Sequence, residues 1–202
     1  MKLTRKALLI SLFLSLSSGI YAQTTFSFHD GANAIGTGLV FDDEAGSIQD
    51  TQGSFTITAE AFLNDSSTGS FFNGTTAAFG INAAGSGDAT AEFDDDNGTE
   101  SMVFSFNIGG TFTSLDLVGI NNDDEATLSF AGGGTYNLSD ATDDFYVIGE
   151  SFTSGQLITL STNATGANFG LEAFTVVPEP GSFALIAGCL GMASIMLKRR
   201  HD

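Results

Sequence analysis

The strongest constraint on the fold of this chain is a regular alternation of apolar and polar side chains over short segments. Residues 54–61 and 101–108 both place an apolar side chain at every second position. A period of two is typical of a half-buried strand, because successive side chains of a strand point to opposite faces. We find no convincing helical period between residues 23 and 177. The alternation therefore predicts an all-β body.

Segments of this kind recur along the body and are separated by Gly, Asn, Asp and Ser. The expected strands are residues 25–28, 38–41, 54–61, 77–82, 101–108, 112–120, 126–130, 135–138, 145–148, 157–162 and 169–176. Short strands with turn signals between them favour an antiparallel β-sandwich, jelly-roll-like in its connections. In the last segment the apolar positions change phase between Leu171 and Phe174, which predicts a bulge near Glu172.

The charges of the body are all of one sign. Between Gln23 and Val177 there are 22 carboxylates and no Lys or Arg, and this stretch also has no Pro, Trp or Cys. A body without cations cannot bind a phosphate backbone, so nucleic-acid binding is excluded. The lack of Cys excludes disulfides and thiolate sites. High charge alone would favour a disordered acidic stalk, but the alternation and 17 phenylalanines in this stretch favour a packed core.

The N-terminal segment, residues 1–22, has the layout of a secretory signal peptide. Lys2, Arg5 and Lys6 form a positive region, an apolar stretch follows, and Ala22 is a suitable last residue before cleavage by signal peptidase. Ile20 is bulkier than the usual residue at its position, and the alternative is an uncleaved N-terminal anchor.

The C-terminal segment, residues 177–202, combines three features. A Pro-Glu-Pro sequence at Pro178, Glu179 and Pro180 (motif 177–181) precedes an uncharged apolar run, residues 182–197, which Lys198, Arg199 and Arg200 follow within the basic end 198–202. The run predicts one transmembrane helix slightly shorter than a hydrocarbon core. The basic residues should stay cytoplasmic, which leaves the acidic domain of residues 23–176 outside the membrane.

These three features resemble the PEP-CTERM sorting signal of exported bacterial proteins. The resemblance implies processing by an exosortase, a membrane enzyme, with the tail removed after transient anchoring in the inner membrane. It also implies release to the cell envelope surface or the exterior, in a bacterium that often makes exopolysaccharide. On this interpretation Pro178, Glu179 and Pro180 are recognition residues. Two prolines flanking one residue also keep the backbone extended and accessible. The alternative is a plain tail anchor.

Acidic loops are the chemically notable feature of the body. The best candidate cation site combines Asp94, Asp96 and Glu100 with Asp88, because Ca²⁺ prefers six to eight oxygen ligands of this type. No loop matches an EF-hand. The alternative is that these are solvated turns, since Asp, Asn and Gly favour turn geometry.

Catalytic patterns are weak in this sequence. His29 is the single histidine between Gln23 and Val177, and no Gly-x-Ser-x-Gly elbow accompanies it. We therefore expect a non-enzymatic structural or interaction protein of the cell surface or extracellular matrix, with exopolysaccharide as a candidate partner. A carbohydrate-binding module, either dependent on Ca²⁺ or not, is the alternative, although the body lacks Trp for stacking on sugar rings. A small hydrolase that uses paired carboxylates is a third and disfavoured hypothesis.

Overall fold

The computed structural model describes residues 23–28, 46–67, 70–74, 78–83, 92–94, 98–120, 124–139, 144–163 and 167–179. These residues form strands and turns, with no helix among them. Residues 23–177 make up one compact unit. The expected strand at 38–41, the signal peptide at 1–22 and the apolar run at 182–197 lie outside the described residues. Within the described part, no helix is long and apolar enough to cross a membrane.

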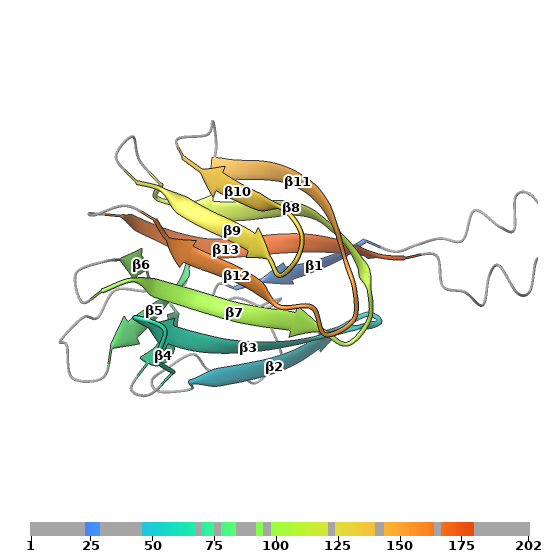
Figure 1. Cartoon of the computed structure of the whole chain (residues 1–202), viewed down its shortest axis with the longest axis horizontal. Coiled ribbons are helices and arrows are strands. Elements are labelled where there is room, and N and C mark those ends of the chain that lie inside the picture. The colour runs from blue at the N-terminus through green and yellow to red at the C-terminus, as the bar shows by residue number, and fades with distance from the viewer. Residues whose placement is uncertain are drawn as a thin grey trace, which may run out of the picture. The chain divides into compact units, whose positions relative to one another are not determined.

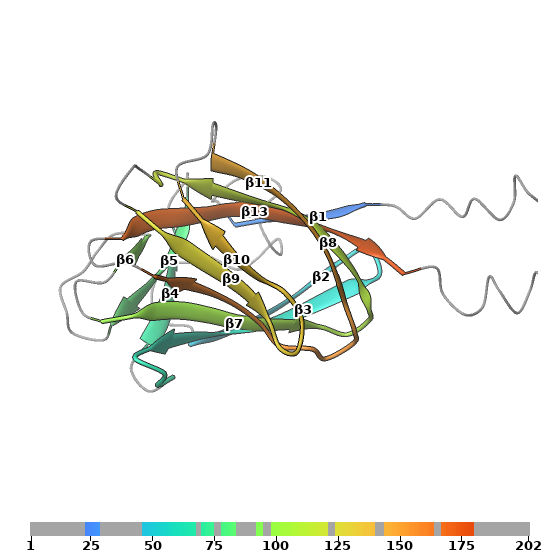
Figure 2. The same cartoon turned by 45° about the horizontal axis from the view of Figure 1, so that its top comes forward.

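Two antiparallel sheets form the body and face each other as a β-sandwich (Figures 1 and 2). The six-stranded sheet has the order β10-β9-β12-β7-β3-β2. Its strands are β2 (Ser47–Gln52), β3 (Phe55–Leu63), β7 (Glu100–Phe106), β9 (Ala126–Phe130), β10 (Thr135–Leu138) and β12 (Ile158–Thr162).

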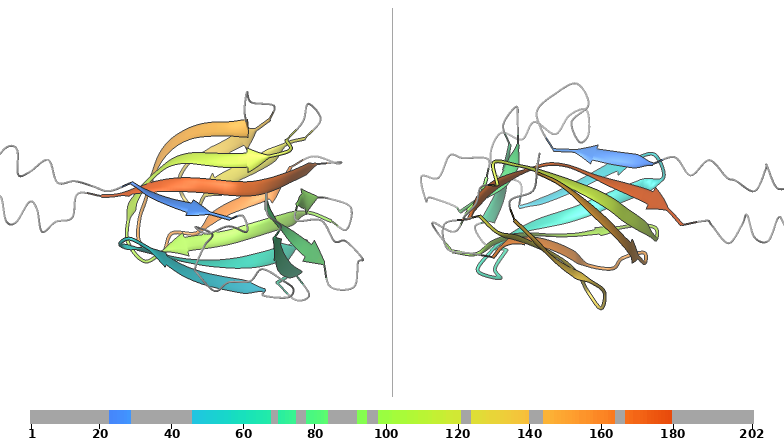
Figure 3. Two further views of the ribbon diagram at one scale, coloured as in Figure 1. Left: turned by 180° about the vertical axis from the view of Figure 1, so that it is seen from behind. Right: turned by 90° about the horizontal axis from the view of Figure 1, so that it is seen from above.

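The seven-stranded sheet has the order β11-β8-β13-β5-β4, with β1 and β6 also paired to β13. Its strands are β1 (Thr24–Ser27), β4 (Ser70–Gly74), β5 (Phe79–Ala83), β6 (Phe93–Asp94), β8 (Gly110–Val118), β11 (Phe145–Phe152) and β13 (Asn168–Pro178). Strand β13 pairs in succession with β6, β5 and β1, which makes it the organising strand of this sheet (Figure 3).

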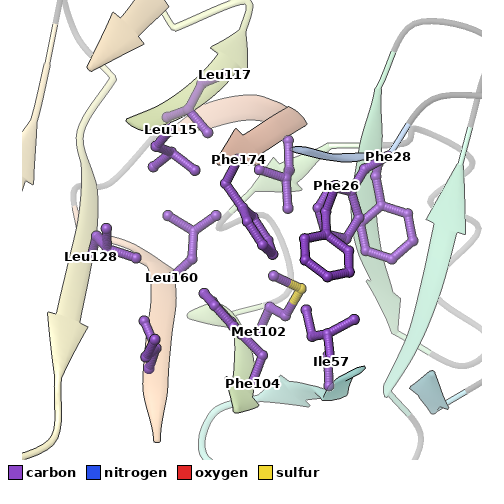
Figure 4. Packing of buried hydrophobic residues seen from close by; sticks show 14 of the residues in the cluster. Phe26, Phe28, Ile57, Met102, Phe104, Leu115, Leu117, Leu128, Leu160 and Phe174 are labelled. Carbon is purple, nitrogen blue, oxygen red and sulfur yellow. The ribbon is translucent and has the colours of Figure 1, made fainter. Parts of the chain in front are cut away.

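Phenylalanine dominates the core between the sheets, as the sequence predicts. Phe104 of the six-stranded sheet stacks on Phe174 of the seven-stranded sheet at a centroid distance of 5.3 Å and an interplanar angle of 12°. Phe26 of β1 and Phe28, which directly follows β1, contact the same Phe174 ring (Figure 4). Each fully buried phenylalanine contributes roughly 1.5–3 kcal/mol by leaving water and needs no polar partner. The core therefore accounts for a stable domain without disulfides.

Most expected strands are present with shifted ends. The predicted strand at 112–120 runs instead from Gly110 to Val118, because Gly119 has a φ of +81° and leaves the extended conformation. The predicted strand at 145–148 continues to Phe152 past a register shift between Val147 and Glu150, where Gly149 has a φ of +73°. The burial of β13 changes phase between Leu171 and Phe174, while Ala173 to Val176 pair with β1 in regular register, so the bulge near Glu172 stays a prediction. Strands β2, β4 and β6 were not predicted.

Candidate functional site

The two ends of the body lie side by side on neighbouring strands. Thr24 of β1 pairs with Val176 of β13 (Figure 3), and the Thr25 and Thr175 hydroxyls lie 3.1 Å apart in a hydrogen bond. The strand β13 ends at Pro178, the first proline of the predicted sorting motif, and the side chain of Glu179 is exposed. Pro180, Lys198, Arg199 and Arg200 lie outside the described residues.

Two of the four predicted cation ligands are described, and they lie close together. The backbone amide of Asp94 donates a 2.9 Å hydrogen bond to Oε2 of Glu100. The backbone amide of Glu100 in turn donates to the Thr162 hydroxyl at 3.3 Å. Both carboxylate side chains are buried. Asp88 and Asp96 lie outside the described residues.

The alternative of a solvated turn does not hold for Asp94 and Glu100, because both residues are buried. Asp94 belongs to β6, where it pairs with Asn168 of β13, and Glu100 is the first residue of β7. Each therefore starts or ends a strand at the rim of the core, which buries it. Among the described residues, no group of three or more His, Cys, Asp or Glu is placed to hold a metal ion.

A third buried carboxylate, which sequence reasoning did not single out, belongs to the same rim. Oδ1 of Asp124 accepts a 3.0 Å hydrogen bond from the backbone amide of Asn168, the residue that pairs with Asp94. Burying a carboxylate is costly unless donors compensate it, and here Asp124 and Glu100 each accept from a backbone N–H. This arrangement gives these carboxylates a structural role at the end of the sandwich where β6 meets β13.

Carboxylates also gather on the seven-stranded sheet. The pKa of Asp116 is raised, first by burial and then by the negative charges of Glu172 and Asp144. Asp116 lies on β8, Glu172 lies on β13, and Asp144 immediately precedes β11. Three neighbouring strands therefore bring acidic groups within reach of one another, with no Lys or Arg between Gln23 and Val177 to neutralise them.

The outer face of the six-stranded sheet has a different character. Most of its inward residues are apolar core residues, with Asp50, Glu100 and Thr162 among the exceptions, and most of the alternate positions carry short uncharged polar side chains. We call these alternate positions the hydroxyl face: Ser47, Gln49, Thr51, Thr56, Thr58, Glu60, Phe62, Ser101, Val103, Ser105, Thr127, Ser129, Thr135, Asn137, Thr159 and Ser161. All are exposed or half-buried except Ser101. The departures from short polar chemistry are Phe62, Val103 and a single carboxylate, Glu60.

Strand register arranges these side chains in rows across the hydroxyl face. One row passes from Thr135 on β10 through Ser129 on β9 to Thr159 on β12. On the other side of the sheet, Gln49 Nε2 donates to the Thr58 hydroxyl at 3.3 Å, and the Thr51 and Thr56 hydroxyls lie 2.9 Å apart. Neighbouring strands lie about 4.8 Å apart, and outward residues of one strand repeat about every 7 Å. The face is thus a regular array of hydrogen-bond donors and acceptors.

The carboxylate of Glu150 connects the edges of the two sheets. Glu150 of β11 accepts hydrogen bonds from the Tyr136 hydroxyl at 2.8 Å and from the Gly134 amide at 3.0 Å. The pKa of Tyr136 is raised, chiefly because its neutral hydroxyl donates to Glu150, with burial and the charge of Glu150 as further causes. This contact binds β10 to β11 and engages Tyr136 in the sandwich itself.

Comparison with known proteins adds no relative: no protein-family model, curated protein or solved structure matches the chain.

Proposed function

We propose that the chain is an exported bacterial protein of the cell surface or extracellular matrix, sorted and processed through a C-terminal PEP-CTERM signal. Signal peptidase would act after the N-terminal segment, residues 1–22. An exosortase-type enzyme would recognise Pro178, Glu179 and Pro180, while the helix at 182–197 and Lys198, Arg199 and Arg200 hold the tail in the inner membrane. The body would act by binding and not by catalysis, on a sandwich with jelly-roll-like connections.

The observation that carries this proposal is the order of motif, apolar run and basic cluster after an all-anionic body. The pairing of Thr24 with Val176 supports it, because both ends of the body leave from adjacent strands. A signal peptide and a membrane tail that are attached to adjacent strands can both insert into the same membrane. A carboxylate-rich body is also disfavoured inside that membrane, where charged groups are costly.

Fractionation of a host that expresses the chain together with an exosortase tests the sorting proposal. The double substitution Pro178→Ala and Pro180→Ala should leave the protein as a precursor in the membrane fraction. The matched control is Val177→Ala, which lies beside Pro178, Glu179 and Pro180 but removes none of them, and should be released like the wild type. Release of the double variant at the wild-type level would contradict the sorting role of the motif.

A second candidate function for the body is carbohydrate binding. The hydroxyl face favours it, because short uncharged donors and acceptors are the groups that pair with sugar hydroxyls. A bound Ca²⁺ at Asp88, Asp94, Asp96 and Glu100 remains a prediction. Thermal unfolding with CaCl2 and with EDTA tests that site. An unchanged melting temperature would contradict the predicted Ca²⁺ site. It would not contradict carbohydrate binding by the hydroxyl face.

A further inference from the structure

We propose that the hydroxyl face binds uncharged polysaccharide chains and discriminates against acidic ones. This inference rests on the proposed carbohydrate-binding function and deepens it, because it names the surface and the class of polymer. The charge distribution is its first support. The body carries 22 carboxylates and no Lys or Arg between Gln23 and Val177, yet this six-stranded face presents one carboxylate, Glu60.

The other sheet provides the contrast. On the seven-stranded sheet, burial raises the pKa of Asp116 first, and the negative charges of Glu172 and Asp144 raise it further. A polymer that approaches that side meets mutually repelling carboxylates and no cation within reach. On the hydroxyl face a neutral polymer meets Ser, Thr, Asn and Gln instead, so no buried charge has to be desolvated.

The chemistry of the face selects among occupants. A polyanion such as nucleic acid or an acidic polysaccharide finds no positive side chain there and is repelled by the body as a whole. An apolar protein surface finds only Phe62 and Val103 as apolar side chains on this face, a single diagonal pair on the adjacent strands β3 and β7. A neutral polymer rich in hydroxyl groups can form hydrogen bonds with the Ser and Thr side chains of the face, because each hydroxyl can donate and accept.

The expected mode of binding is extended and additive. The face carries no Trp or Tyr, so it offers no aromatic stacking beyond Phe62. Each neutral hydrogen bond contributes only about 0.5–1.5 kcal/mol net. Useful affinity therefore requires a long polymer that contacts several rows at once, such as the row of Thr135, Ser129 and Thr159. A disaccharide should not compete.

Affinity electrophoresis of the exported protein tests the inference. Native gels contain hydroxyethylcellulose, dextran or galactomannan as neutral polymers, or alginate as an acidic one, and a gel without polymer is the reference. The wild type should be retarded by at least one neutral polymer and not by alginate. The disaccharide cellobiose in the gel should leave the retardation unchanged.

Matched charge variants locate the binding surface. The double substitution Thr58→Glu and Thr159→Glu adds two carboxylates to the hydroxyl face and should weaken retardation about tenfold. The control Thr111→Glu and Ser151→Glu adds the same charge to a cross-strand pair on the seven-stranded sheet and should bind like the wild type. Glu60→Gln removes the single carboxylate of the face and should strengthen binding. Melting curves establish that each variant is folded.

Each remaining outcome contradicts a defined part of the inference. Retardation that both double variants keep, or that both lose equally, would place binding elsewhere and leave the carbohydrate-binding proposal standing. Stronger retardation by alginate would overturn the preference for uncharged chains. Retardation by none of the polymers would overturn carbohydrate binding and this inference together. Concentration-dependent migration in the reference gel that Thr58→Glu and Thr159→Glu abolish would assign the face to a second copy instead.

Discussion

The Thr25 hydroxyl lies 3.1 Å from the Thr175 hydroxyl, a hydrogen bond that joins the first strand of the body to the last across 150 residues of sequence. The bond lies within a ladder in which Thr24 pairs with Val176 and Ser27 pairs with Ala173. Strand β1, which begins just after the expected signal peptide, thus pairs with the strand that leads into the proposed sorting motif. The fold depends on both ends of the body being present together.

Truncation of the two buried phenylalanines at β1, Phe26 within the strand and Phe28 directly after it, should therefore destabilise the whole domain. Phe26 and Phe28 are fully buried and contact Phe174 at 5.3 Å and 5.0 Å between ring centroids. We expect Phe26→Ala or Phe28→Ala to lower the free energy of unfolding by about 3–5 kcal/mol. Urea unfolding of the exported protein measures this loss.

The matched control for β1 is Phe145→Ala, because Phe145 is 48% exposed at the start of β11. Phe145→Ala should lower the free energy of unfolding by less than about 1 kcal/mol. Equal losses at Phe26 and Phe145 would show that β1 does not hold the core.

Removal of the Tyr136 hydroxyl should loosen the contact between the sheet edges. Tyr136→Phe deletes the donor to Glu150 and leaves the Gly134 amide as the other donor to that carboxylate. We expect a loss of about 0.5–1.5 kcal/mol at neutral pH, which chemical denaturation can resolve. Thr135→Ser on the outward side of the same strand is the control and should change little.

The same contact predicts a pH dependence with a definite sign. The pKa of Tyr136 is raised in the folded state, so the folded state holds the phenolic proton more tightly than the unfolded state. The stabilisation is fully present below the unfolded pKa of about 10 and is lost as the pH rises through the folded pKa. Wild type should thus lose more stability than Tyr136→Phe between pH 9 and about pH 12. Parallel losses in both proteins would contradict the assignment.

Neutralisation of Asp116 should stabilise the domain at pH 7. Its raised pKa means that the folded state favours the protonated carboxyl, so stability falls as the pH rises from the unfolded pKa of about 3.9 through the folded pKa. Asp116→Asn should therefore raise the melting temperature at pH 7, with a smaller effect at pH 3. Glu60→Gln on the opposite sheet removes the same charge as a control. An equal rise for both would point to total charge and not to the burial of Asp116 and its Glu172 and Asp144 neighbours.

Sequence patterning revealed the strands that are buried on one face only. The alternation in β7 and β9 is visible because their outward positions, such as Ser105 and Ser129, are polar while their inward positions are apolar. Strand β2 escaped prediction because Ile48 is its single buried apolar residue. The second half of β11 was missed because Gly149 interrupts the alternation at a register shift.

The candidate sites also differ in whether local sequence is enough to predict them. The proposed sorting motif rests on sequence alone, since its residues are contiguous, and it stays a prediction. The rim contacts of Asp94, Glu100 and Asp124 depend on pairing between β6 and β13, a long-range register that local patterning does not specify. The hydroxyl face also needs strand order, because its rows combine residues such as Thr127 and Ser161 from separate strands.

The most direct test of the central claim is the intact mass of the protein after export. A chain processed at both ends should start near Gln23 and end near Val177, without Lys198 to Asp202, which leaves a body with 22 carboxylates and no Lys or Arg. Mass spectrometry of the released protein reports both boundaries at once. A released or surface form that still carries Lys198 to Asp202 would contradict processing through the C-terminal signal and would indicate a permanently membrane-anchored protein.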